Sequence, residues 1–358
     1  MILTELRICD FRNLGLVHLE PSPGFNVFEG PNGQGKTNLL EAIYLLGALK
    51  SFRSTVNKEL IRFEAQQADI RGIVRHQESE RVLRMTVGAR GRLFWIDGKA
   101  SRNLTDSLGQ MRVVLFAPED LAITKGSPSG RRRFLDRAVF NRWPASLQDM
   151  RRYEEALKQR NALLKDEGPD TLLDVFDEQL ADSASRVVGW RHRYLGSYVP
   201  TFIDSLAEAT GGELAGTLSY EPKTPAETVE EFLAAFRQSR RRDRARRTTS
   251  LGPHVDDLYA ELEGRSARSF ASQGQHRAFV LAMKIAEIRT LKDALGYSPV
   301  LLLDDVSSEL DAGRNEHLMR YLNSDSFGGQ VFLTTTDRGY VRIDSDFACF
   351  TIRAGEVT

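Results

Sequence analysis

Apolar residues follow two different spacings along this 358-residue chain, and the change of spacing divides it into three parts. Near both ends, short apolar runs and alternating stretches predict β-strands, whereas i, i+3, i+4 spacing between charges predicts helices in the middle. The expected strands are 2–9, 16–20, 25–28, 69–76, 81–88, 92–98, 113–116, a short pair in 211–220, 257–263, 299–304, 330–334 and 349–353; the expected helices are 39–49, 146–165, 171–202, 228–247, 275–295 and 311–322. We predict an α/β domain from residues 1–120 and 250–358, with a mixed β-sheet, flanking helices and additional antiparallel strands, and an inserted, mainly helical domain at 121–249.

The stretch 29–37 fits the phosphate-loop pattern G-x-x-x-x-G-K-[ST], with Gly30, Gly35, Lys36 and Thr37 at the fixed positions. Glycines let backbone N–H groups converge on a polyphosphate, and the following helix adds its free N-terminal amides and its dipole. We expect Lys36 to reach the β- and γ-phosphates and the Thr37 hydroxyl to ligate Mg²⁺. A strand before the loop and a helix after it favour this interpretation over an ordinary glycine turn.

A second motif is the apolar run 299–303, which ends in Asp304 and Asp305. An apolar run suits a strand buried on both faces, and ligands bind at the carboxyl ends of such strands. We expect Asp304 to share the Mg²⁺ with Thr37, and Asp305 to orient or deprotonate an attacking water. The alternative is a strand-end turn with solvated acids. The catalytic residues expected are therefore Lys36, Asp304 and Asp305.

Two shorter segments accompany these motifs. Residues 270–275 place Ser272, Gly274 and Gln275 at the start of an expected helix, where a hydroxyl and free amides can bind an anion. An ordinary helix N-cap is the alternative, and this segment alone favours it. Residues 307–311 follow the Asp pair, and residues 334–337 end the next strand.

Together these residues resemble the ATP-binding cassette (ABC) ATPases of the chromosome-maintenance and DNA-repair branch, in the family order of phosphate loop, signature, Walker B and D-loop. Finer features resemble the RecF family of recombination-mediator ATPases over nearly the whole chain. The segments that carry this likeness are 10–13, 116–121, 125–128, 131–136 and 252–254.

The resemblance implies an ATP-dependent homodimer in which two heads enclose two nucleotides. Ser272, Gly274 and Gln275 would then contact ATP bound to the opposite subunit's phosphate loop. The expected ATP-binding residues are Arg12, Asn13, Gly30, Asn32, Gly33, Gly35, Lys36, Thr37, Ser272, Gly274 and Gln275, and the expected metal ligands are Thr37 and Asp304.

The chain departs from the family pattern at three places. Asp305 stands where transporter cassettes have Glu, so the expected base is one methylene shorter, and we expect slow hydrolysis suited to a switch. Thr336 and Asp337 stand where many cassettes carry a switch histidine. Val255 replaces an Arg of the related segment, and the sequence assigns no role to 252–257 beyond a loop that leads into a strand.

Two arginine clusters stand out in a chain whose 49 basic residues equal its 49 acidic ones. A solvated helix face is the usual meaning of such runs, although guanidinium groups also suit phosphates. We expect contact with duplex DNA backbone, without base stacking, because few aromatic residues interleave. The clusters are Arg131, Arg132 and Arg133, and Arg237, Arg240, Arg241, Arg242, Arg244, Arg246 and Arg247, the second opposed in sequence only by Asp243.

Composition adds the cellular setting. No apolar run approaches the roughly 20 residues that a membrane span needs, and the N-terminus does not resemble a signal peptide. Two cysteines, Cys9 and Cys349, argue against a disulfide scaffold or a cysteine zinc site. We therefore expect a cytoplasmic protein.

The leading hypothesis is a weak, switch-like ATPase that binds duplex and gapped DNA in recombinational repair. Resemblance to the RecF family implies partnership with RecO and RecR, loading of RecA at single-strand gaps, and roles in replication and the SOS response to DNA damage. The alternatives are the nucleotide-binding subunit of an ABC transporter, an SMC-type tether and a P-loop kinase of small molecules. The absent Leu-Ser-Gly-Gly-Gln form and the short insertion weigh against the first two.

Overall fold

The computed structural model describes residues 1–101, 107–306, 310–337, 339, 341–344 and 346–358, which form two compact units. Unit 1 contains Met1–Leu121 and Glu287–Thr358, and unit 2 contains Ala122–Ala286. Unit 2 thus continues beyond residue 249, because two strands and most of a long helix pack with the helices of the expected insertion. The predicted domain limits stay a prediction, since a compact unit need not fold on its own.

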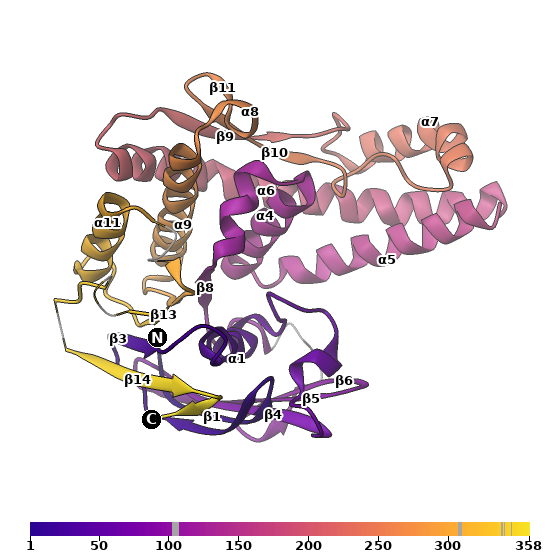
Figure 1. The fold of residues 1–358 in the computed structure, drawn as a ribbon. Helices are drawn as coiled ribbons and strands as arrows, with labels where there is room; N and C mark the ends of the chain where they lie inside the picture. Colours follow the sequence, from indigo (N-terminus) through magenta and orange to yellow (C-terminus); the bar gives the residue numbers. More distant parts are fainter. Residues whose placement is uncertain (102–106, 307–309, 338, 340, 345) are drawn as a thin grey trace. The chain divides into compact units, whose positions relative to one another are not determined.

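Unit 1 contains an antiparallel sheet of six strands in the order β2-β1-β4-β5-β6-β7 (Figure 1). Its strands are β1 (Ile2–Phe11), β2 (Leu14–Leu19), β4 (Gln67–His76), β5 (Ser79–Gly88), β6 (Gly91–Ile96) and β7 (Lys99–Ala100). Buried and exposed residues alternate along β1 and β4, so one face of the sheet is in the core and the other faces solvent. The predicted antiparallel strands are confirmed.

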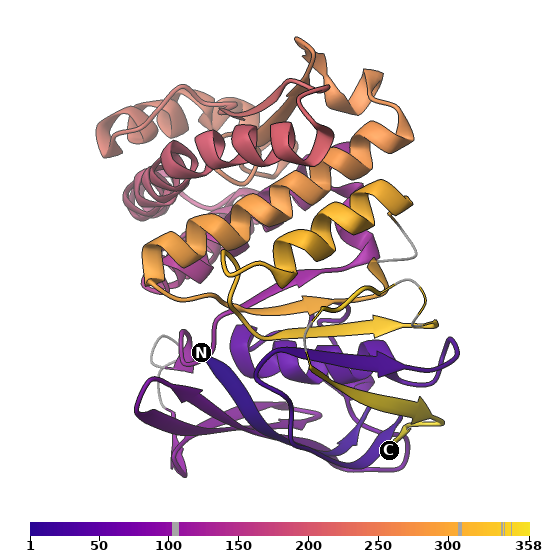
Figure 2. The ribbon, with the colours of Figure 1, turned by 90° about the vertical axis from the view of Figure 1, so that its left-hand side faces the viewer.

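A second sheet of unit 1 has the order β15-β14-β3-β13-β12-β8, and all its pairs are parallel except β14 with β15. Its strands are β3 (Phe25–Glu29), β8 (Val113–Phe116), β12 (Val300–Leu303), β13 (Val331–Thr335), β14 (Phe347–Arg353) and β15 (Glu356–Val357). In Figure 2 the yellow β14 lies beside the indigo β3. The two ends of the chain therefore build one sheet, as the paired motifs predicted.

Helix α1 (Lys36–Ala48) lies between the two sheets of unit 1, because it contacts β1, β4 and β5 of the first and β8 and β13 of the second. Leu39, Leu40 and Ile43 are fully buried there. Unit 1 also contains α11 (Ala312–Asn323), the C-terminal turns of α9 (Gln273–Leu295) and the short η1 (Asn57–Leu60) and η2 (Pro118–Leu121). Within the described ranges, no helix has the length and apolar character needed to cross a bilayer.

Unit 2 is mainly helical, with a three-stranded antiparallel sheet in the order β11-β10-β9. Its elements are α3 (Ala122–Lys125), α4 (Pro128–Arg142), α5 (Ser146–Lys165), α6 (Asp170–Thr210), β9 (Gly216–Glu221), α7 (Val229–Arg246), β10 (Asp257–Leu262), β11 (Arg265–Ser266), α8 (Ala267–Phe270) and the first turns of α9. The predicted strand pair within 211–220 is wrong: β9 is a single strand that pairs with β10. Helix α4 was missed, because its mixed composition lacks a clear apolar stripe.

The long helix α6 belongs to two hydrophobic clusters of unit 2. Its C-terminal half packs with α4, β9, β10 and α9 around Tyr198 and Phe202. Its N-terminal half packs with α5 and α7 around Leu180 and Phe236. The predicted α/β fold with a helical region is confirmed.

Candidate functional site

The order of the parallel sheet brings the phosphate loop and the acidic strand end together. The loop follows β3, Asp304 follows β12, and β13 lies between these two strands. The Thr37 hydroxyl donates a hydrogen bond of 2.9 Å to Asp304 Oδ1, although the two residues are 267 positions apart. The structure thus unites the two residues that the sequence selected as joint metal ligands.

Glycine is required at two loop positions for different reasons. A Cβ at Gly30 would lie 2.4 Å from the backbone oxygen of Ile352, so only glycine fits against β14. Gly35 has φ +117°, which side chains rarely adopt, and a Cβ there would meet Asn13. The loop is therefore shaped by its neighbours as well as by its own sequence.

Lys36 is held across the loop at the start of α1. Its ammonium donates to the carbonyl oxygens of Gly30 (2.6 Å) and Pro31 (3.0 Å). Burial lowers the pKa of Lys36, and the carboxylates of Asp305 and Asp304 oppose this shift. The cation is thus placed in the loop and turned toward the acidic strand end.

Asp304 is 5 % exposed and accepts hydrogen bonds on one oxygen from the hydroxyls of Thr37 and Thr334, each 2.9 Å long. Burial raises the pKa of this carboxyl group, and the two hydroxyl donors oppose the shift. A divalent cation would restore charge balance at such a buried acid. Sequence analysis missed Thr334, which lies on β13 between the two motif-bearing strands.

The residues at this strand end fit Mg²⁺ and not a metal caged by protein ligands. Among the described residues, no group of three or more His, Cys, Asp or Glu side chains could hold an ion. Mg²⁺ commonly uses one or two carboxylates, with phosphate oxygens and waters filling its octahedron. Thr37 and Asp304 would hold it, and the bound ion would neutralise charge on the phosphates. Asp305 adopts a left-handed conformation (φ +48°), and its N–H donates to the Thr334 hydroxyl (2.8 Å).

The turn between β1 and β2 packs against the phosphate loop. Asn13 Nδ2 donates to the Gln34 carbonyl (3.0 Å), and Asn38 Nδ2 donates to Asn13 Oδ1 (2.8 Å). Arg12, at φ +56°, makes two 2.9 Å hydrogen bonds with the fully buried Glu41 of α1. The structure therefore places Asn13 on the loop and holds Arg12 beside it.

Glu41 is the centre of a network that sequence analysis missed. Besides Arg12, it accepts a hydrogen bond from the Ser51 hydroxyl and lies 3.7 Å from a guanidinium nitrogen of Arg53. Arg53 also donates to Asn38 (2.7 Å), the residue after Thr37. The only sequence signal for this network is an acidic residue, Glu41, within the apolar pattern of the helix, and it belongs to no known motif.

The helix start at residues 272–275 lies in unit 2. The Ser272 N–H donates to Gln275 Oε1 (2.8 Å), and the Gln275 N–H donates to Ser272 Oγ (3.2 Å). This reciprocal pair is a capping box that satisfies two helix-terminal donors. Ser272 is exposed and Gly274 falls in the first turn of α9. Their role toward a second subunit stays a prediction, and Ser307, Ser308 and Glu309 of the expected D-loop lie outside the described residues.

The first arginine cluster is largely engaged inside unit 2. Arg131 is 5 % exposed and forms a bidentate pair with Asp257 (2.7 and 2.8 Å). Arg132 donates to the Asp256 carbonyl (2.6 Å), whereas Arg133 is exposed. Asp256 and Asp257 thus have a structural role: they hold α4 to the start of β10.

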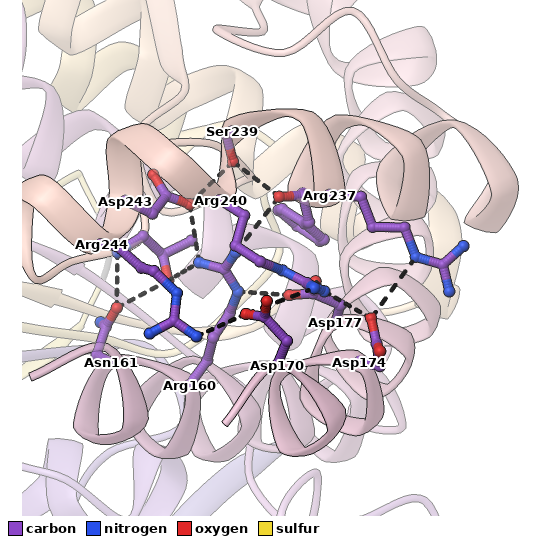
Figure 3. A network of polar contacts seen from close by, with 12 residues as sticks. Arg160, Asn161, Asp170, Asp174, Asp177, Arg237, Ser239, Arg240, Asp243 and Arg244 are labelled. Carbon is purple, nitrogen blue, oxygen red and sulfur yellow. Dashed lines mark hydrogen bonds and ion pairs between the residues drawn. The ribbon is translucent and has the colours of Figure 1, made fainter. Parts of the chain in front are cut away.

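The second cluster faces acids from another helix, which its own sequence did not reveal. Figure 3 shows Arg160 of α5 pointing toward Asp177 of α6 and Asp243 of α7, at 2.6 and 2.9 Å. Arg240 pairs with Asp170, Asp174 and Asp177 of α6. Further ion pairs with α6 or the α5–α6 turn join Arg237 to Asp174, Arg244 to Asp170 and Arg247 to Glu167. Arg242 donates to Ser250, while Arg241 and Arg246 are exposed and form no ion pair with any described residue. The cluster is therefore mostly a helix-to-helix connection.

The segment 252–254, left unassigned by the sequence, packs against α5 and α6. His254 Nδ1 lies 2.5 Å from the Tyr153 hydroxyl, and Nε2 lies 3.1 Å from the Thr249 carbonyl oxygen. Arg191 donates to the Pro253 carbonyl (2.8 Å). These contacts make the segment a connector between α7 and β10.

Comparison with known proteins assigns the family. Residues 2–356 match the family model described as the RecF/RecN/SMC N terminal domain. The chain is 45 % identical over 360 residues to the DNA replication and repair protein RecF of Myxococcus xanthus, covering 96 % of this chain and 92 % of that one. It is 43 % identical over 368 residues to RecF of Anaeromyxobacter sp. (strain Fw109-5), covering 100 % and 99 %.

Solved structures agree with the sequence relatives. A structure of the recombination mediator protein RecF-ATPrS in the RecFOR pathway superposes with a TM-score of 0.91 at 32 % identity, covering 99 % of this chain and 97 % of that one. An Smc head bound to the C-winged helix domain of ScpA has a TM-score of 0.57 at 17 % identity, covering 100 % and 96 %, and shares the fold alone.

Proposed function

Because the chain belongs to the RecF family of DNA replication and repair proteins, we propose that it is an ATP-switched DNA-repair protein that acts as a recombination mediator. The observation that carries this proposal is the hydrogen bond between Thr37 and Asp304, which joins the phosphate loop to the acidic strand end. Related RecF structures are described as bound to ATP or to ATPrS. The family match over the whole chain favours this function over the transporter and kinase alternatives.

The phosphate loop and the acidic strand end have different roles toward ATP. Gly30, Gly33 and Gly35 allow the tight curvature of the loop, so that its backbone N–H groups would converge on the phosphates. Asn32 lies within the loop, and Lys36 would neutralise the β- and γ-phosphates. Thr37 and Asp304 would hold Mg²⁺, and the bound ion would offset charge on the phosphates. Asp305 orients the attacking water, and its short side chain suits slow hydrolysis. Arg12 and Asn13 approach the nucleotide from the β1–β2 turn, supported by their contacts with α1 and the loop.

ATP also switches the assembly between monomer and dimer. Ser272, Gly274 and Gln275 of one protomer complete the nucleotide site of its partner. A ligand that binds only the dimer shifts the equilibrium toward it, and hydrolysis reverses the shift. The exposed position of Ser272 supports this role.

In the dimer, the protein binds duplex and gapped DNA and works with RecO and RecR to load RecA. Membership of a family whose relatives are placed in the RecFOR pathway supports these partners. Arg133, Arg241, Arg242 and Arg246 are exposed members of the two arginine clusters that form no ion pair with a described residue, and they therefore suit phosphate contact.

Replacing Lys36 tests the nucleotide site directly. Hydrogen bonds to charged groups contribute about 1.5–3 kcal/mol, so Lys36→Ala should weaken Mg-ATP binding roughly tenfold to a hundredfold in calorimetry. Lys99→Ala, on exposed β7, is the matched control and should bind ATP normally. Unchanged affinity in Lys36→Ala would reject the site.

Ser272→Arg separates binding from assembly. We expect this variant to bind ATP yet remain monomeric in sedimentation with Mg-ATP, because Ser272 serves the opposite subunit. A wild-type protein that stays monomeric with ATP, or a Ser272→Arg dimer, would contradict the shared site while leaving ATP binding itself intact.

A further inference from the structure

Three arginines that are far apart in sequence are neighbours in the antiparallel sheet. Arg7 pairs with Arg71, and Arg71 pairs with Arg84, each as direct partners on adjacent strands. The row continues to His18 on β2 and Trp95 on β6. We name the basic row as His18, Arg7, Arg71, Arg84 and Trp95, which crosses five strands.

The basic row lies on the face of the sheet opposite α1. The side chains of Arg7 and Arg84 are 52 % and 49 % exposed, whereas their neighbours Leu6, Ile8 and Leu83 are buried. Like charges placed directly opposite each other on adjacent strands destabilise a sheet. Fold stability therefore gives no reason for three arginines in register.

Acidic neighbours neutralise the row only in part. Glu5 lies 2.5 Å from Arg7 and 3.6 Å from Arg71, and Asp69 lies 2.8 Å from Arg84. Among the described residues, two carboxylates thus serve three guanidinium groups, and Glu5 is also 3.8 Å from His18. The row keeps a positive balance and exposed N–H donors.

Two exposed leucines border the row on one side. Leu16 (83 % exposed) and Leu93 (61 % exposed) stand at the two ends of the adjacent register row, on β2 and β6. Trp95 carries the guanidinium of Arg84 over its ring at 5.3 Å. The residues that line a groove in this face include Arg7, Leu16, Arg71, Arg84, Trp95 and one acid, Asp69. Arginine and tryptophan are enriched at protein-binding surfaces, and the exposed leucines add apolar area that a partner could bury.

We propose that this sheet face is the docking surface for an acidic amphipathic helix of a partner protein. Strands lie about 4.8 Å apart, so the five-stranded row is about 19 Å long. A helix rises 1.5 Å per residue, and about 13 residues would cover that length. Its acidic stripe pairs with the three arginines, and its apolar residues cover Leu16, Leu93 and Trp95. This docking goes beyond the ATP switch and does not depend on it.

Two other occupants fit this face less well. The phosphates of a nucleic acid would lie close to the carboxylates of Glu5 and Asp69 and be repelled by them. Its bases could stack on Trp95 alone, and Leu16 and Leu93 would remain uncovered. A second copy of the chain, related by a two-fold axis, would place the same arginines against one another. An acidic helix satisfies both the charges and the leucines.

The test uses the full-length protein and a fluorescein-labelled 14-residue helical peptide with Glu at i, i+4 and Leu on the adjacent stripe. We expect fluorescence polarisation to report binding that weakens at least tenfold in the triple variant Arg7→Gln/Arg71→Gln/Arg84→Gln and in Leu16→Asp/Leu93→Asp. The control variant Arg75→Gln lies on the same sheet but outside the row, and it should bind like the wild type. A scrambled peptide of equal charge should bind at least tenfold more weakly.

Three outcomes would overturn the proposal. One is equal binding of the scrambled peptide, another is unchanged peptide binding in the triple variant, and the third is row-dependent binding of oligothymidylate that excludes the peptide. A melting curve gives an independent measurement. Arg71→Gln should leave the melting temperature unchanged or raise it, because it relieves repulsion. A clear fall would assign the row to stability instead.

Discussion

Two groups of arginines in this protein differ in how their spacing along the sequence relates to their exposure in the fold. On α7, Arg240, Arg241, Arg242 and Arg244 are almost contiguous, yet acids of α6 engage Arg240 and Arg244. On the antiparallel sheet, Arg7, Arg71 and Arg84 are scattered along the chain, yet strand register gathers them into one exposed row. A run of like charge in sequence is therefore a weak guide to exposed charge in the fold.

The physical difference lies in solvation. Arg160 is fully buried, and its charge is tolerated because Asp177 and Asp243 are buried with it and the hydroxyl of Thr249 accepts another hydrogen bond. The sheet arginines stay in water, where each ion pair contributes little. Arg160 and the α7 arginines that pair with α6, Arg240 and Arg244, should thus govern the stability of the α5–α7 bundle, and the sheet arginines should govern binding.

Arg160→Ala should show the largest effect. Removing one partner of a buried ion pair costs about 3–5 kcal/mol, because Asp177 and Asp243 would keep uncompensated charges. Urea unfolding followed by circular dichroism, with hydrogen exchange of α5, α6 and α7, measures the loss. Arg151→Ala, exposed on the same helix, should change stability by less than about 0.5 kcal/mol. Equal stability of the Arg160→Ala and Arg151→Ala proteins would contradict the view that buried, paired arginines stabilise this unit and exposed ones do not.

The exposed α7 arginines that form no ion pair with a described residue, Arg241 and Arg246, should act on DNA instead. In the double variant Arg241→Gln/Arg246→Gln, two phosphate contacts are lost, so the slope of log affinity against log salt should fall by about 2. Asp174 and Asp177 hold the Arg240 side chain away from DNA, so Arg240→Gln should keep the wild-type slope. Duplex binding at several salt concentrations measures both. A larger change of slope in a folded Arg240→Gln protein would contradict the assignment.

Lowering the pH should reduce the stability of unit 2 more than that of the antiparallel sheet of unit 1. This effect should be the smallest of those predicted. Burial and the nearby charge of Arg132 lower the pKa of His254, while its bond to the Thr249 carbonyl and the carboxylates of Asp256 and Asp243 oppose the shift. Because the unfolded chain then binds more protons, stability is complete above the ordinary value of 6.5 and falls as pH drops below it.

Hydrogen exchange between pH 7 and pH 5, corrected for intrinsic rates, measures this loss. Protection of α5 and β10 should decline in the wild type and decline less in His254→Asn. Protection of β4 and β5 is the internal reference. An identical decline in the variant would show that His254 does not contribute.

Most elements and the main residues of the candidate nucleotide site could be selected from local pattern. Gly30, Gly35, Lys36 and Thr37 are defined by spacing, and helix α5 was predicted with its observed bounds. Glu41 and Thr334 could not be predicted, because what makes them important is the neighbour that each meets, Arg12 in one case and Asp304 in the other. The pairing of β9 with β10 was missed for the same reason: it joins segments separated by α7.

By itself the sequence determined the phosphate loop, the acidic strand end and the alternation of strands and helices, since these depend on residue type at short spacing. Only the tertiary structure decided which charges are exposed, because burial and pairing depend on partners brought from distant positions. Asp170, Asp174 and Asp177 engage Arg240 and Arg244 of the α7 arginine run and so connect two helices. The register of β1, β4 and β5 turns three isolated arginines into a surface.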